Sequence, residues 1–146
     1  MAGIREDYIE RMIQRLAAAL AAILKAGKAQ KTEEALELVH QTSLSLFGME
    51  YRMLVTIDAG SVAELLGHPE KLKALAKLMG AEADLLLRRG DTAEASQRLW
   101  HVLALLQEVQ RRRSTPDSES EALLGNVRDR LAEFGDWSPH SVSGSA

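Results

Sequence analysis

The 146-residue chain contains no cysteine, and this absence removes several kinds of chemistry at once. Disulfides, thiolate metal sites and cysteine nucleophiles are all excluded. The chain also has no basic excess: 18 Lys and Arg residues against 21 Asp and Glu residues give a formal net charge of −3. Because a general nucleic-acid binder normally carries a basic excess, we expect no nucleic-acid partner. The missing cysteine also suits a reducing compartment, so we expect a cytoplasmic protein.

Aromatic residues make up only 4% of the chain, and there are three prolines. The core must therefore come from Leu, Ala, Ile, Val and Met, of which Leu and Ala are strong helix formers. The composition favours an all-α fold. An apolar run over residues 16–24 is far too short to cross a bilayer. Acidic residues also lie where a signal peptide would be positive, so we expect no membrane association.

No catalytic pattern is present in the sequence. The four histidines form no His-x-x-x-His pair, the glycines lack phosphate-loop spacing, and no serine sits in a nucleophile elbow. We therefore predict that the protein is not an enzyme and has no catalytic residue, metal site or cofactor.

The stretch 69–113 is the most informative part of the chain, because it predicts two amphipathic helices joined by a tight turn. Pro69 suits the first helical position, and Gly90 suits the left-handed residue that ends a helix. Asp91, with Glu94 three residues later, predicts a capping box for the second helix. Asp84 and Arg88 have the spacing of an i,i+4 ion pair.

Residues 85–95 (LLLRRGDTAEA) resemble the turn of a tetratricopeptide repeat. In that family a small residue on the first helix and an alanine on the second let the helices approach closely, and Ala83 and Ala95 match those positions. The resemblance implies a closely packed helical hairpin. Glu82 departs from the pattern, which prefers leucine there, and Gln107 stands near the usual closing proline.

Two more helices are expected before the hairpin, over residues 4–26 and 32–47. Gly27 is the expected end of the first, and Thr32 the expected cap of the second. The sequence TEEA at 32–35 recurs as TAEA at 92–95, which suggests two stacked helix pairs, a minimal solenoid. Helix starts often share Thr and Glu, so coincidence also explains the match.

Residues 49–67 lack clear periodicity. A lone strand here would have nothing to pair with, so we expect a short helix at 49–55 and another that ends near Leu66. After residue 113, Thr115 and Pro116 are the expected cap and first position of a final helix.

The start of the chain, residues 4–16 (IREDYIERMIQRL), resembles the opening of a family of small uncharacterised bacterial helical proteins. With the second helix and the hairpin, the resemblance covers about two thirds of the chain. It implies an all-helical fold, and because that family has no established activity, it transfers no active site to this chain. Together these patterns predict an all-α domain over residues 1–135, with antiparallel helical hairpins stacked as a short tetratricopeptide-like solenoid and a C-terminal capping helix. Residues 136–146 are predicted to be a disordered tail.

We therefore expect a non-enzymatic protein–protein interaction module or adaptor. Two basic groups are candidates for contact with an acidic partner or a C-terminal carboxylate. They are Lys73, Lys77 and Arg88 on the first helix of the hairpin, and Arg111, Arg112 and Arg113 at the end of its second helix. The simpler interpretation is a solvated helix face in the first case and pairing with the helix dipole in the second. Alternative functions are a homo-oligomeric structural protein, such as a homodimer with a helical seam, or a small-ligand-binding helical domain.

Overall fold

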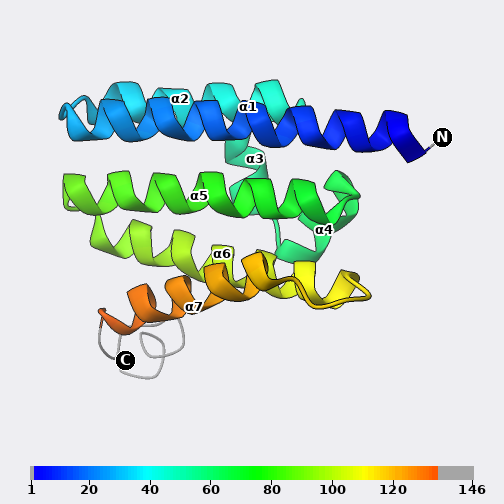
Figure 1. Ribbon diagram of the computed structural model, residues 1–146. Coiled ribbons are helices and arrows are strands. Elements are labelled where there is room, and N and C mark those ends of the chain that lie inside the picture. The colour runs from blue at the N-terminus through cyan, green and yellow to red at the C-terminus, as the bar shows by residue number, and fades with distance from the viewer. Residues whose placement is uncertain (1, 135–146) are drawn as a thin grey trace.

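The computed structural model describes residues 2–134, and within this range the chain forms seven helices and no strand. The all-α class predicted from composition is confirmed (Figure 1). The helices are α1 (Ala2–Lys28), α2 (Thr32–Phe47), α3 (Tyr51–Thr56), α4 (Ala59–Leu66), α5 (Pro69–Arg89), α6 (Thr92–Arg112) and α7 (Ser118–Ala132). The predicted disordered tail over 136–146 lies outside the described residues.

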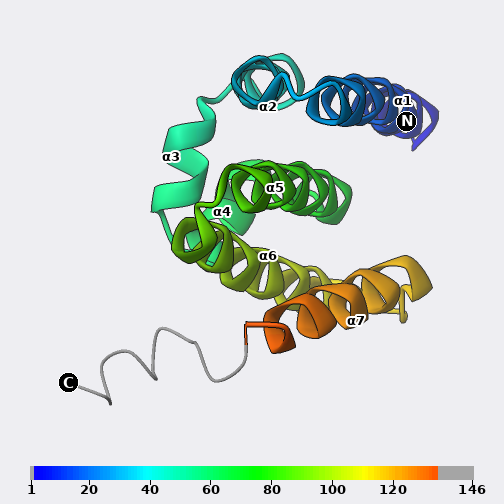
Figure 2. The ribbon, with the colours of Figure 1, turned by 90° about the vertical axis from the view of Figure 1, so that its left-hand side faces the viewer.

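The helices are arranged in layers (Figures 1 and 2). The antiparallel helices α1 and α2 form one layer and α5 packs beneath both of them. Next to α5 lies its antiparallel partner α6, and α7 packs on α6. The short helices α3 and α4 carry the chain along one side from the first hairpin to the second. As a result α1, α5 and α7 run in the same direction, and α2 and α6 run against them.

Helix α5 is the centre of the core. It contacts α1, α2, α4 and α6, and its leucines and Met79 are buried on more than one side. Each fully buried side chain of this size contributes roughly 1.5–3 kcal/mol of burial free energy. The apolar faces of the predicted hairpin, now α5 and α6, are therefore covered by further helices on two sides.

The turns around α5 follow the sequence signals. Pro69 occupies the first turn of α5, and Nδ1 of the preceding residue, His68, accepts a hydrogen bond from the Glu70 backbone N–H at 3.0 Å. Gly90 has φ of 91°, and its N–H caps the C-terminus of α5. The segment around residue 51, which we expected to be helical rather than a strand, forms α3.

The side-chain cap hydrogen bonds predicted for the N-termini of α2 and α6 do not form. Helix α2 begins at Thr32 itself, and Lys31 is the cap residue. Asp91 is the cap residue of α6, but its side chain makes no cap hydrogen bond. The Asp91 carboxylate instead accepts a bond from Arg89 Nε at 2.6 Å, because a guanidinium is a stronger partner than a backbone amide.

The start of the final helix is also corrected. Asp117 caps α7 and accepts a hydrogen bond from the Glu119 N–H, so Thr115 and Pro116 lie before the helix. Gly27 does not end α1, which continues to Lys28. A Cβ built on Gly27 would lie 3.0 Å from Leu85 Cδ2, so this glycine lets α1 lie close against α5.

Candidate interaction groove

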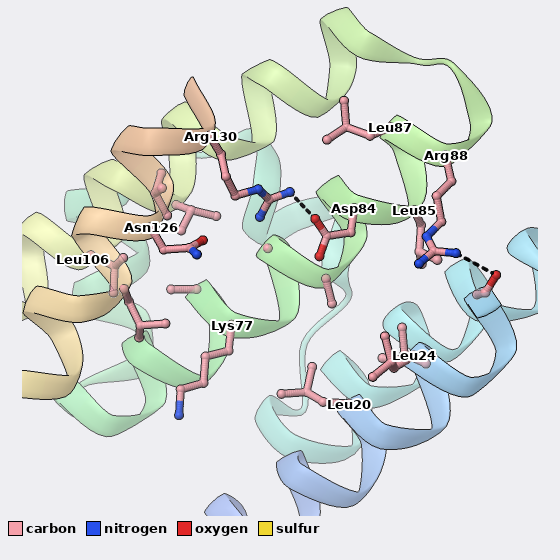
Figure 3. A pocket seen from close by; sticks show the side chains of 18 residues that line it. Leu20, Leu24, Lys77, Asp84, Leu85, Leu87, Arg88, Leu106, Asn126 and Arg130 are labelled. Atoms are coloured by element: carbon pink, nitrogen blue, oxygen red, sulfur yellow. Dashed lines mark hydrogen bonds and ion pairs between the residues drawn. The ribbon is translucent and has the colours of Figure 1, made fainter. Parts of the chain in front are cut away.

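An open groove lies between α1 and α7, with α5 at its floor (Figure 3). Its volume is about 520 Å³. The residues that line it are Leu20, Ile23, Leu24 and Gly27 from α1, Ala76, Lys77, Gly80, Ala81, Asp84, Leu85, Leu87 and Arg88 from α5, Val102 and Leu106 from α6, and Leu123, Asn126, Val127 and Arg130 from α7. We call this surface the α1/α5/α7 groove.

Small residues on α5 leave the space at the floor of the groove unfilled. Gly80, Ala76 and Ala81 follow one another on the face of α5 between α1 and α7. A Cβ built on Gly80 would meet nothing within 4 Å, so the space above this glycine is open. Leucines rise on the α1 side, and Leu24 is 53% exposed. The groove is therefore an apolar channel with free space along its floor.

Two polar contacts link α5, at the floor of the groove, to the helices α7 and α1 on either side. Arg130 of α7 forms an ion pair with Asp84 of α5 (Figure 3). Partial burial raises the pKa of the Asp84 carboxyl above its usual range, against the opposing effect of Arg130 and Arg88. On the other side, Arg88 Nη1 donates to the Gly27 carbonyl at 3.3 Å. A cation is favourable there because Gly27 lies in the last turn of α1, at the negative end of the helix dipole.

The expected i,i+4 pair of Asp84 with Arg88 is thus replaced by a contact between helices. Asp84 forms its ion pair with Arg130, 46 residues away, and Arg88 forms its hydrogen bond with a backbone carbonyl. Three basic side chains line the groove, Lys77, Arg88 and Arg130, against the single carboxylate of Asp84. Arg130 pairs with Asp84 and Lys77 pairs with Glu119, so Arg88 is the groove cation that forms no ion pair with a described residue.

The groove continues along α1 towards the start of α5. A smaller cavity of about 140 Å³ shares Leu20 and Lys77 with it and is lined further by Ile13 and Ala17 of α1. Positions 13, 17, 20 and 24 alternate steps of four and three, so they follow one stripe of the helix. The apolar wall of α1 therefore extends over about three helical turns.

Comparisons with known protein families, with curated proteins and with solved structures found no match for this chain. The groove has to be interpreted from its own geometry and charge.

Lys73 and Lys77, two of the predicted partner-binding residues, form ion pairs inside the fold. Lys73 is buried, and its Nζ lies 2.8 Å from Glu119, 2.9 Å from Asp117 and 3.2 Å from Glu70. Burial alone would lower the pKa of Lys73, but the three carboxylates outweigh it and the pKa is raised. Lys77 Nζ lies 2.8 Å from Glu119 and remains partly exposed at the groove.

The arginines at the end of α6 also pair within the chain. Arg111 and Arg112 both contact Glu108, at 3.3 and 3.2 Å, and Arg112 reaches Glu64 of α4 at 3.3 Å. Arg113 pairs with Glu70 and with Asp117. These contacts hold the end of α6 against α4 and the start of α5. Of the six predicted residues, Lys77 and Arg88 line the groove, whereas Lys73 lines its smaller continuation.

Sequence reasoning missed most of the groove residues. Gly80, Asn126 and Arg130 carry no motif, and they line one groove only because α7, packed on α6, faces α5 across it. The one available signal was the apolar stripe on α1, which extends past the positions that the core needs.

Among residues 2–134, no group of three His, Asp or Glu side chains is placed to hold a metal ion. In the same range, no helix combines the length and the apolar composition that a membrane crossing requires.

Proposed function

We propose that this chain is a non-enzymatic protein-interaction module, built as a short tetratricopeptide-like solenoid, that binds an amphipathic helical segment of a partner protein. The occupied surface is the α1/α5/α7 groove. A partner helix would place its apolar face on the small residues of α5 and carry acidic side chains on its flanks. The absence of cysteine suits a cytoplasmic setting for such a module.

The observation that carries the proposal is the combination of an open apolar channel with one cation, Arg88, that forms no ion pair with a described residue. Helix-in-groove recognition needs an apolar trough into which side chains spaced at i, i+4 and i+7 can insert. The groove supplies this trough along a stripe of α1 that reaches from Ile13 to Leu24. Arg88 and Lys77 stand on α5 at the trough, and Arg88 forms no ion pair with any residue that the structure describes.

A peptide fits this surface better than a small molecule does. Small-ligand sites enclose most of the ligand and aim several polar groups at it. Here the polar groups are engaged with one another, as Asp84 is with Arg130, and the channel is open and long. The helices α1 and α5 are the first members of two successive hairpins, and α7 runs in the same direction as both. In a helical solenoid, first helices stacked in this way form a concave binding face, which supports the proposal.

The test uses two synthetic amphipathic peptides with the same apolar stripe, one with acidic flanks and one with basic flanks. Binding is measured by fluorescence anisotropy. We expect the acidic peptide to bind. The substitution Gly80→Trp should fill the open floor and weaken binding by about tenfold or more, which corresponds to about 1.4 kcal/mol.

Gly125→Trp is the matched control. Gly125 is an exposed helical glycine of α7 whose Cβ would also meet nothing within 4 Å, but it does not line the groove. Equal binding by Gly80→Trp and the parent protein, or a preference for the basic peptide, would contradict the proposal. Arg88→Glu gives a second readout, because it should weaken the acidic peptide and strengthen the basic one.

The alternative of a homo-oligomer has one observation in its favour. Helix α1 exposes large apolar side chains, Tyr8 at 48% and Ile13 at 41%, next to exposed alanines. Close packing of such a face against a second copy would cover it. Light scattering at micromolar concentration separates the two functions, since a clean monomer removes this alternative.

A further inference from the structure

A second cavity lies on the side of α5 that faces α2, α3 and the first half of α6. Its volume is about 320 Å³, and most of the side chains that line it are polar. An adjoining cavity of about 350 Å³ shares His40, Tyr51 and Arg52 with it. We call the first of these the Glu82 cavity, after the carboxylate buried in its wall.

Glu82 is an unusual residue for this position. Its side chain is only 7% exposed, although it lies in the middle of a helix that otherwise buries apolar side chains. Burial of a carboxylate is costly unless it is paired and hydrogen-bonded, and a leucine would fill the same position without that cost. Glu82 also stands out in the sequence, because the tetratricopeptide repeat pattern that this turn resembles prefers leucine at that position.

Two donors hold the Glu82 carboxylate, and both use one of its oxygens. Tyr51 Oη donates to Oε1 at 2.6 Å, and Arg98 Nε donates to the same atom at 2.7 Å. Burial, followed by the nearby negative charge of Glu82, raises the pKa of Tyr51 well above its usual range, so the phenol remains a donor. A carboxylate can accept about four hydrogen bonds over two oxygens, so Oε2 keeps capacity for another donor.

The charges around the cavity favour a positive ligand. Four glutamates and three arginines line it, and the adjoining cavity adds Glu50. Ion pairs already engage most of these groups, because Arg89 pairs with Glu33 and Asp91, and Arg98 pairs with Glu82 and Glu94. The charged side chains of the two cavities that form no ion pair with a described residue are Glu37 and Glu50, against Arg52.

At the mouth, Glu37 and Arg52 are both exposed, and neither forms an ion pair with a described residue. The side chain of Arg52 is long and flexible enough to turn to solvent. His40 packs its ring edgewise on Tyr51, with ring centroids 5.3 Å apart, and so forms an aromatic wall beside the carboxylate.

We propose that the Glu82 cavity binds the guanidinium or primary ammonium group of an organic cation. Glu82 Oε2 is the buried acceptor, and Glu37 is the acceptor at the mouth. Charge-assisted hydrogen bonds of this kind are short and strong, and a guanidinium matches a carboxylate in shape. The cation belongs either to a free small molecule or to a basic side chain of a peptide, and the two sources share this chemistry.

The experiment is an NMR titration of the full chain, with amide shifts followed by residue. The probes are methylguanidinium, n-butylammonium and the capped tripeptide Gly-Arg-Gly, with inorganic phosphate as the opposite charge. We expect saturable shifts at α2, α3 and the middle of α5 with the cations. Tighter binding of the tripeptide than of methylguanidinium assigns the cation to a peptide, and equal or weaker binding assigns it to a free small molecule.

Two variants and one control decide the assignment. Glu82→Gln keeps the shape of the side chain but removes its charge, and should weaken cation binding by about 10–100-fold, as expected for the loss of a charge-assisted bond. Glu37→Gln, at an exposed position, should weaken it by a few-fold. Asp84→Asn, on the groove side of α5, should leave it unchanged.

The proposal would be overturned if none of the three cationic probes gave saturable shifts, or if phosphate bound more tightly than they did. Unchanged affinity in a folded Glu82→Gln variant would do the same. If Glu82→Gln does not fold, the Glu37→Gln variant decides the assignment. Unchanged cation affinity in Glu37→Gln overturns the proposal, whereas weaker binding in Glu37→Gln, with unchanged binding in Asp84→Asn, supports it.

Discussion

Alanine at Gly80 should stabilise the protein, whereas alanine at Gly27 should not, although both glycines lie in helices that pack on each other. The first substitution gains helix propensity, which is worth about 0.8–1 kcal/mol for Gly→Ala in a helix interior. Nothing lies within 4 Å of the new Cβ at Gly80, so no clash offsets the gain. For a chain of this size the melting temperature should rise by about 2–4 °C.

At Gly27 the same methyl group meets a packed neighbour. The Cβ would lie 3.0 Å from Leu85 Cδ2, and Leu85 is 3% exposed, so it has little room to move. Overpacking typically costs about 1–3 kcal/mol. Because Gly27 is in the last turn of α1, its propensity gain is smaller than the interior value, and we expect a net loss of about 1 kcal/mol.

The assay is guanidinium chloride unfolding followed by circular dichroism, with the denaturant slope checked for constancy. Gly125→Ala serves as the control, because this helical glycine of α7 also faces open space and should gain as Gly80 does. A Gly80→Ala variant that is less stable than the parent, or a Gly27→Ala variant that gains equally, would refute the packing described for α1 and α5.

Three further predictions concern buried polar groups. Lys73→Met should cost about 1–3 kcal/mol in denaturant unfolding, because it leaves the carboxylates of Glu70, Asp117 and Glu119 without their shared cation; no change would show that the cluster contributes nothing. The Lys73 ammonium, helped by Ser120, holds the pKa of Asp117 at about 2, below its usual value. The ionised Asp117 therefore stabilises the fold fully above about pH 4, and this stabilisation is lost as the pH falls towards 2. Denaturant unfolding at several acidic pH values should show the free energy of unfolding decline over this range, and Lys73→Met should reduce the decline. Burial lowers the pKa of His101, although a hydrogen bond with the Leu54 backbone opposes the effect, so the unfolded chain binds more protons and stability should fall as the pH drops below about 6.5. The same measurement on His101→Gln should lack that decline.

The helices themselves could be predicted because their signals are local. Apolar residues at steps of three and four, Pro69 at a first position and Gly90 at an end depend on neighbours within one or two turns. The insert was harder, but the argument that a lone strand has no partner gave the right class for α3. Some predictions failed locally, as at Asp91, whose carboxylate binds Arg89 two residues away. Others failed at residues that also contact a distant part of the chain. Asp117 caps α7 in place of Thr115 while its carboxylate also binds Lys73, 44 residues away.

The charged residues show the same limit more clearly. The sequence could identify Lys73 and Arg113 as basic, but not that both would contact Asp117 and Glu70. The pairing rule for neighbouring turns of one helix predicted the wrong partner for Asp84, because α7 brings Arg130 to it from outside. A glycine's role is similarly non-local: Gly27 resembles a helix end in the sequence, and only the approach of Leu85 explains it.

The two proposed sites can be tested independently because they lie on opposite faces of α5. An α-helix turns by about 100° per residue, so Gly80, Asp84 and Arg88 span about 80° of its circumference. On the same scale Glu82 and Arg89 lie about 180–200° away from Gly80. The lining residues agree, since the first three belong to the groove and the other two to the Glu82 cavity. A substitution in one site therefore leaves the contacts of the other in place, and Gly80→Trp should not change cation binding, just as Glu82→Gln should not change peptide binding. A variant that weakened both would point to a disturbance of α5 itself, and its unfolding curve would reveal that.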